Sequence, residues 1–240
     1  MIQPLRAIAF ALVTLFAVVG ARQASAADSF ELTSIKAVRP TLVNTLNALQ
    51  MKDIGKARDA FEAYDAAWNG IEVYINTRSK ELYSAIEHDL QAKIEKELAA
   101  ASPDYPTLVA DTQMILAKYD EAIAMVASGK PLSPLYDDVA RLRIVRAPMR
   151  IVLSALKAGN VEKARKSYEM FDANWDSIED LIKARSEDAY VAIEKGMIQI
   201  EQALMADKPD AAQVTTLVNA LNTQYNAALA EIMKDARAAK

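Results

Sequence analysis

The chain has 240 residues with 32 acidic and 28 basic side chains, which gives a formal net charge of −4. A mildly acidic protein lacks the excess positive charge that binding to nucleic acid or to an anionic membrane requires. The sequence contains no cysteine and one histidine. It therefore excludes disulfides, thiolate metal sites, c-type haem attachment and zinc sites built from several histidines.

Residues 1–26 have the features of a secretory signal peptide. A positively charged start precedes a short apolar run at 7–20, and the Ala-Ser-Ala sequence at 24–26 fits a small-x-small cleavage site. The run is shorter than the ~20 apolar residues that span a bilayer, and charges interrupt every later apolar segment. We therefore expect cleavage after Ala26, export to the periplasm and no membrane span in the mature chain.

Two segments of the remaining chain are closely similar. Residues 56–90 and 163–197 are identical at 16 of 35 positions when they are aligned at an offset of 107. Further along, one deletion changes the offset to 106, and the similarity extends over nearly the whole mature chain. Such self-similarity predicts an internal duplication. We take residues 27–130 as the first unit and residues 131–240 as the second unit.

Each unit has a helical pattern throughout, because glycine is rare and apolar residues recur at spacings of three and four. The helices are expected at 31–51, 53–77, 79–100 and 105–128, and at 134–157, 160–184, 186–206 and 210–237. The fold class is therefore all-α, with two tandem, pseudo-symmetric antiparallel helical bundles. Pro40 and Pro148 fall inside the first helix of each unit, where proline is expected to kink or break the helix.

The junction between the second and third helices decides the geometry of each unit. Neither glycine nor proline forces a turn there, but Ser79 and Ser186 can each cap a new helix. A turn gives helices of similar length, as an up-down bundle needs. Without it, the two helices would merge into one of roughly 47 residues, which is uncommon in globular domains. We favour the turn and keep the continuous helix as the alternative.

Acidic side chains recur at matching positions of the two units and are candidate metal ligands: Asp65, Glu72, Glu87, Asp172, Glu179 and Glu194. A turn near residue 79 would bring Glu72 and Glu87 to the same level, about 10–13 Å from the turn. Carboxylate clusters suit hard cations such as iron(III), manganese or calcium. The candidate supporting residues repeat beside the acids: Trp68, Arg78, Tyr83, Trp175, Arg185 and Tyr190.

Packing explains the aromatic residues more simply. Trp68 belongs to a row of apolar side chains that recurs every seven residues along the second helix, which predicts a packed core. Its indole N–H is then expected to find a buried acceptor.

Basic side chains offer another role for the acids. The first helix of each unit carries cations: Lys36, Arg39, Arg143, Arg146 and Arg150. Ion pairs between these cations and the carboxylates would fix the order of the helices without binding a ligand. The two interpretations remain open, and they coincide if an arginine holds a carboxylate pair until a ligand arrives.

Catalytic constellations are missing from the sequence. His88 is the single histidine; it aligns with Lys195 and is expected on an exposed helix face. A Ser-His triad and a glycine-rich phosphate loop are both absent. We therefore expect a protein that is not an enzyme.

The pattern W-x3-E, R-[SD], Y-x3-E runs from Trp68 to Glu87 and again from Trp175 to Glu194. It resembles the helical extracytoplasmic regions attached to FTR1-type iron permeases and, more distantly, the imelysin-like domain of periplasmic iron-uptake proteins. The resemblance covers the second and third helices of each unit. It implies a periplasmic helical domain that handles iron or another metal, with a membrane permease or another periplasmic protein as its partner.

The sequence also departs from these families. The Arg-Glu-x-x-Glu motif of the permease membrane helix and the His-x-x-Glu motif of imelysin-like proteins are absent, so no ligand set can be transferred. The sequence thus predicts a non-enzymatic metal-binding protein, with iron as the favoured metal, or one that assists metal import. The alternative is a structural or protein-interaction scaffold whose acids and arginines form salt-bridge networks.

Overall fold

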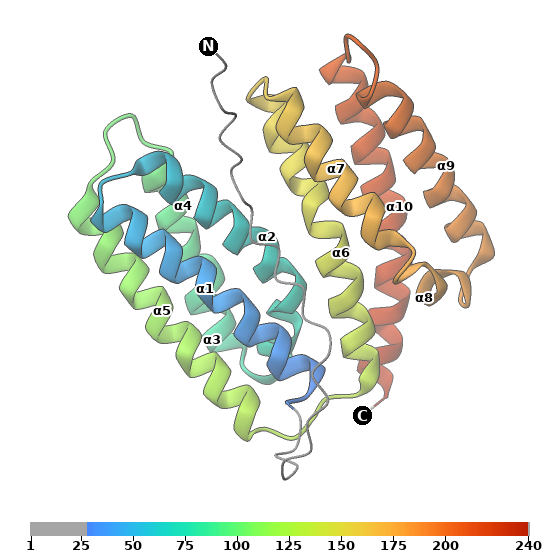
Figure 1. Cartoon of the computed structure of the whole chain (residues 1–240). Helices are drawn as coiled ribbons and strands as arrows, with labels where there is room; N and C mark the ends of the chain where they lie inside the picture. Colours follow the sequence, from blue (N-terminus) through green and yellow to red (C-terminus); the bar gives the residue numbers. More distant parts are fainter. Residues whose placement is uncertain (1–27, 240) are drawn as a thin grey trace, which may run out of the picture.

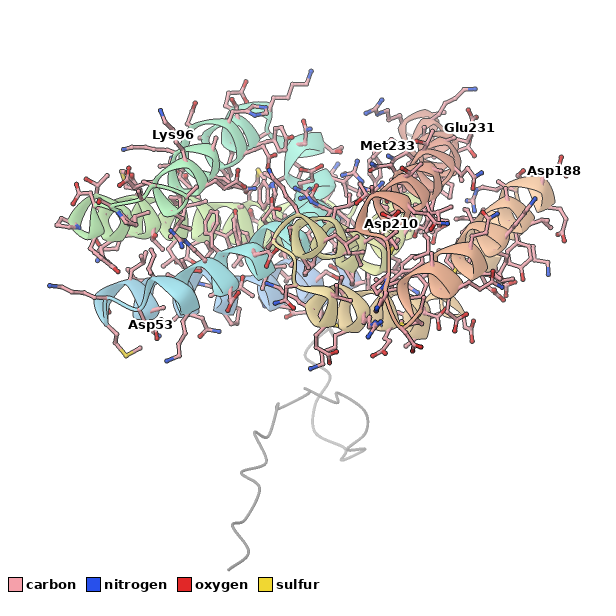
Figure 2. All side chains as sticks on the ribbon, turned by 90° about the horizontal axis from the view of Figure 1, so that it is seen from above. Asp53, Lys96, Asp188, Asp210, Glu231 and Met233 are labelled. Carbon is pink, nitrogen blue, oxygen red and sulfur yellow. The ribbon has the colours of Figure 1, made fainter. Side chains whose placement is uncertain are left out.

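The computed structural model describes residues 28–239, so the expected signal peptide lies outside the described part. All regular secondary structure in this range is helical, which confirms the all-α fold class. Figures 1 and 2 show, from two directions, two groups of helices that lie side by side. None of the helices in residues 28–239 is long and apolar enough to cross a bilayer.

The first group is an antiparallel bundle whose third helix runs without a break from residue 80 to residue 98 and contains a π-helical segment. Its elements are α1 (Phe30–Gln50), α2 (Ile54–Arg78), α3 (Lys80–Ser84), the π-helix η1 (Ala85–Gln91), α4 (Ala92–Leu98) and α5 (Tyr105–Ser128). The second group repeats this order. Its elements are α6 (Pro134–Lys157), α7 (Val161–Trp175), α8 (Glu179–Lys183), α9 (Glu187–Leu204) and α10 (Ala211–Ala238).

The favoured turn between the second and third helices is confirmed in both units. α2 ends at Arg78, and Ser79 adopts an extended conformation with φ −146° and ψ 108°. The Ser79 hydroxyl accepts a hydrogen bond from the backbone N–H of Leu82 at 3.1 Å, and Ser186 caps α9 in the same way through Ala189 at 3.1 Å. The continuous helix is therefore wrong.

The second helix of the second unit is shorter than predicted. The expected helix at 160–184 is interrupted, because α7 ends at Trp175 and α8 begins at Glu179. Ser177 lies in the interruption, where its hydroxyl donates to the carbonyl oxygen of Asn174 at 2.6 Å. Short polar side chains compete in this way for backbone groups. Asp176 and Ser177 are exposed, so no packing offsets their weak helix preference, whereas Ile178 is buried.

The aromatic row of α2 forms part of the core, as predicted. Trp68 and Tyr64 are fully buried there. Tyrosines of the last helix of each unit tie it to the first helix: the Tyr119 hydroxyl donates to the Ile35 carbonyl oxygen at 2.8 Å. Tyr225 makes the matching bond to Leu142 at 2.7 Å. α1 and α6 both continue through their internal prolines, so neither helix is broken.

α2 and α6 are the helices through which the two groups meet (Figure 1). Gly70 of α2 lies against Ile144 of α6 in this contact. A Cβ atom at this position would come within 2.4 Å of Ile144 Cγ1 and 3.3 Å of the Ile144 Cα atom. The missing side chain of Gly70 therefore allows α6 to pack directly on the backbone of α2.

Candidate functional site at the junction of the two units

Glu87 and Glu194 accept hydrogen bonds from the two tryptophans. Trp68 Nε1 donates to Glu87 Oε2, and Trp175 Nε1 donates to Glu194 Oε1. Both indoles are buried, so each carboxylate satisfies an N–H that would otherwise be costly to bury. This confirms the expected buried acceptor. It also gives a structural reason for the tryptophan and glutamate that recur 19 residues apart in both units.

Arginines of α6 bind the other two acids of the first unit. Arg143 Nη1 lies 2.7 Å from Glu72 Oε1, and Arg150 Nη2 lies 2.9 Å from Asp65 Oδ2. The side chains of Glu72 and Arg143 are only 17% and 20% exposed. Burial raises the pKa of Glu72; Arg143 opposes the rise and the nearby Glu87 carboxylate adds to it. Arg143 and Arg150 thus act between the units.

Glu72 and Glu87 lie close enough for their charges to interact, as the predicted hairpin requires. Tyr83 lies close enough to be affected by both charges. The Tyr83 ring is nearly parallel to the Trp68 indole, with an interplanar angle of 12° and centroids 6.3 Å apart. Burial, together with the charges of Glu72 and Glu87, raises the pKa of Tyr83 to about 12. Across residues 28–239, however, no three His, Cys, Asp or Glu side chains are arranged so that they could hold a metal ion.

Gln91 is a member of this junction that the sequence interpretation missed. Its Nε2 donates to Asp65 Oδ1 at 2.6 Å, although its side chain is almost fully buried. Burial raises the pKa of Asp65, while Arg150 and the Gln91 hydrogen bond oppose the rise. Asp65 is therefore held from two sides, by α6 of the second unit and by the π-helix of its own unit.

The π-helix explains how Gln91 reaches the core. The buried positions of the third helix are Ile86, Gln91, Ile94 and Leu98 in the first unit and Ile193, Met197, Ile200 and Leu204 in the second. The first interval is five residues in the first unit and four in the second. The wider turn of η1 takes up one additional residue. The signal in the sequence is the change of offset from 107 to 106, which corresponds to this additional residue.

The matching acids of the second unit lack such partners. Asp172 is exposed and Glu179 is half-buried. In the described part of the chain, neither side chain forms an ion pair or a hydrogen bond. The structure therefore brings the predicted acidic residues together with cations in the first unit only.

Arg78 and Arg185 lie at the ends of their hairpins and do not pair with the candidate ligands. Arg78 forms an ion pair with the buried Glu31 at the start of α1, and its Nη2 also donates to the Lys130 carbonyl oxygen at 2.9 Å. Arg185 Nη2 lies 3.6 Å from Asp138 on α6. Both arginines therefore attach a hairpin turn to the start of a first helix.

The remaining predicted residues contact other residues of their own unit. The Lys183 ammonium lies 4.5 Å from the centroid of the Tyr190 ring. His88 is exposed, as expected, and its ring meets the Tyr83 ring edge-on at 5.5 Å. Arg146 donates to Asn226 and burial lowers its pKa. The aligned Arg39 pairs with Asp120, at 2.6 Å between Nε and Oδ1.

No protein-family model, curated protein or solved structure matches this chain. The resemblance to iron-uptake proteins therefore stays a prediction from the sequence.

Proposed function

We propose that the protein is a non-enzymatic helical scaffold in which the repeated acids and arginines set the geometry of two bundles. One observation carries this proposal: the acids predicted as metal ligands in the first unit are bound by other side chains. Glu72 and Asp65 pair with arginines, and Glu87 accepts from Trp68. A rigid pair of bundles with a defined angle suits a protein that presents a fixed surface to another protein.

The ion pairs act as rungs of a ladder between α2 and α6. Asp65 and Glu72 are seven residues apart on α2, and their partners Arg150 and Arg143 are seven residues apart on α6. The order of the partners is reversed, so the later residue of α2 pairs with the earlier residue of α6. Seven residues correspond to about 10.5 Å of helix. One rung would restrict only the separation of the helices, whereas two rungs also restrict their register. Such pairs contribute to specificity of packing more than to net stability.

Glu62 of α2 adds two further polar contacts with the second unit next to the Asp65–Arg150 pair. Glu62 Oε1 accepts from the Ser154 hydroxyl at 2.5 Å, and Glu62 Oε2 lies 2.6 Å from Lys163 Nζ. The acidic face of α2 is thus matched by donors over a length of three helical turns. In keeping with this proposal, export by the predicted signal peptide would place the scaffold in the periplasm, with a permease or another periplasmic protein as its partner.

Metal binding, with iron as the favoured ion, is the second candidate function. The observation in its favour is the proximity of Glu72, Glu87 and Tyr83, three oxygen-bearing side chains that influence one another's charge. One member of this group, Glu72, is already paired with Arg143. A metal ion would have to displace the guanidinium before it could use both carboxylates.

Glu72→Gln and Glu179→Gln provide a matched test, because the two residues align in the two similar segments of the sequence. The scaffold proposal expects Glu72→Gln to lower the free energy of unfolding by about 1 kcal/mol, since the neutral amide weakens the hydrogen bond that the half-buried Arg143 donates at this position. Glu179→Gln is expected to change it by less than about 0.5 kcal/mol. Urea denaturation measures both values. Equal effects of the two substitutions would contradict the proposed role of the ladder.

Thermal denaturation with iron, manganese, copper or calcium salts separates the two candidate functions. The scaffold proposal expects no metal-dependent rise in Tm. A rise that the double variant Glu72→Gln, Glu87→Gln abolishes would favour metal binding at the predicted pair and would displace the scaffold proposal.

A further inference from the structure

A cleft lies at one end of the α2–α6 junction and is shared by the two units. Its volume is about 550 Å³, which is within the range of small-molecule sites. The last turns of α2 contribute Asn76 and Thr77, and the start of α3 contributes Lys80. The second unit contributes side chains of α6 and of the end of α10, where Figure 2 labels Met233.

Positive charge exceeds negative charge on the walls of this cleft. Three cations line it, namely Lys80, Arg143 and Arg237, against the single carboxylate of Glu72. Glu72 accepts from Nη1 of Arg143. Within residues 28–239, Lys80 and Arg237 have no acidic partner within ion-pair distance, and they come from different units. Cations that line one cleft repel each other and attract an anion into it.

Uncharged polar groups complete the lining. Asn76 and Thr77 offer an amide and a hydroxyl, and Tyr136 is about 94% buried at the start of α6 while it still lines the cleft. The Tyr136 hydroxyl forms no hydrogen bond with any described residue. Most of the ring is buried, but the hydroxyl oxygen itself stays accessible at the wall of the cleft, where it can donate to a ligand oxygen. Val73 and Met233 supply an apolar part of the wall.

A second cleft at the same junction has a different charge pattern. Its volume is about 740 Å³, and its charged residues are nearly balanced: Arg58, Lys157 and Lys163 against Asp59, Glu62, Asp65 and Glu95. Lys163 is already paired with Asp59 and Glu62, and Arg58 donates to the Leu98 carbonyl oxygen at 2.7 Å. Of these two clefts, only the cleft of Lys80 and Arg237 has more cations than carboxylates on its walls.

We propose that the cleft lined by Lys80, Arg143, Arg237 and Tyr136 binds a small organic anion through its carboxylate or phosphate oxygens. Lys80 and Arg237 neutralise the anion from the two units, and Arg143 donates through the N–H groups that its pair with Glu72 leaves available. Tyr136 donates its hydroxyl, and Val73 and Met233 contact the carbon skeleton. Because the anion contacts both units, its binding also strengthens the junction. This site goes beyond the scaffold proposal and does not depend on it.

Isothermal titration with citrate and with inorganic phosphate, at constant ionic strength, tests the site on the full mature chain. The two probes distinguish carboxylate from phosphate recognition. We expect at least one of them to bind with a Kd below about 1 mM. The double variant Lys80→Gln, Arg237→Gln is expected to weaken that binding by about tenfold or more, because each substitution removes a charge-assisted contact. Tyr136→Phe is expected to weaken it by at least about threefold.

The control variant Lys166→Gln, Lys234→Gln removes the same charge from exposed positions outside the cleft. It is expected to bind the anion as the wild type does. Without added anion, the double variant in the cleft is expected to keep the Tm of the wild type, since neither cation has a carboxylate partner. The proposal fails if neither probe binds at up to about 10 mM. It also fails if the cleft variant binds normally or if the control weakens binding equally.

Discussion

The second helix of the first unit, α2, and its counterpart in the second unit, α7 followed by α8, have related sequences but different environments on their outward faces. On α2, Val73 is 4% exposed and Gly70 lies against Ile144 of α6. The residues that align with them at an offset of 107 are Asp180 and Ser177, and both are exposed. Within the described chain, α2 packs extensively against two helices, α1 and α6, whereas α7 packs extensively against α6 alone.

The contrast shows that similar sequences can form the same contacts inside a unit and different contacts on its outward face. Several contacts inside the units are shared, such as the two tryptophan–glutamate bonds and the bonds of Tyr119 and Tyr225 to the first helix. The acids on the outward face differ in their partners, because only the first unit has a neighbour on that side. Polar replacements such as Asp180 fit a face that remains in water, as at the end of a repeat array. The duplication itself stays a prediction from the sequence.

Gly70→Val and Ser177→Val are expected to give the largest contrast between the two faces. The valine side chain at position 70 would force α6 away from α2, at a cost of about 3 kcal/mol in the free energy of unfolding. The same substitution at the exposed position 177 is expected to cost less than about 0.5 kcal/mol. Urea denaturation measures both. A mild effect at position 70 would show that the two helices can separate freely.

Trp68→Phe and Trp175→Phe examine what the two units share. Each substitution removes a buried N–H donor and leaves a glutamate without it, so each is expected to cost about 2 kcal/mol. Denaturation followed by circular dichroism provides the measurement. If one substitution cost several times more than the other, the tryptophan–glutamate bonds would not be equivalent in the two units.

The smallest expected effect is the pH dependence that Glu72 confers. Its pKa is raised in the folded state, chiefly by burial, above the ordinary value of 4.5. The folded protein therefore binds this proton more tightly than the unfolded chain. This contribution to stability is fully present below pH 4.5 and is lost as the pH rises through the folded-state pKa of Glu72.

Unfolding free energies of the wild type and of Glu72→Gln, measured from pH 4 to pH 7, isolate this titration. The stability of the wild type relative to the variant is expected to fall as the pH rises above 4.5. A difference that rises with pH over this window would mean that Arg143 outweighs burial.

Local sequence pattern was sufficient for the helices and for the hairpin turn. Apolar spacing placed α5 and α6 at their observed residues, and Ser79 marked the turn because a serine cap acts within a few residues of itself. The sequence predicted that the Trp68 N–H would have a buried acceptor, without identifying it as Glu87. Helix geometry predicted that Glu87 lies level with Glu72 along the hairpin. These features depend on contacts within one hairpin.

The partners of the acidic residues and the interruption of the second unit's second helix depend on tertiary packing. Whether Glu72 has an arginine partner depends on which helix covers α2, and α6 reaches it from another unit across 71 residues of chain. The interruption after Trp175 likewise follows from an uncovered face rather than from a glycine or a proline. Identical acids in two repeats therefore have different partners, because an ion pair requires a cation within about 4 Å, and only the packing of the units supplies one.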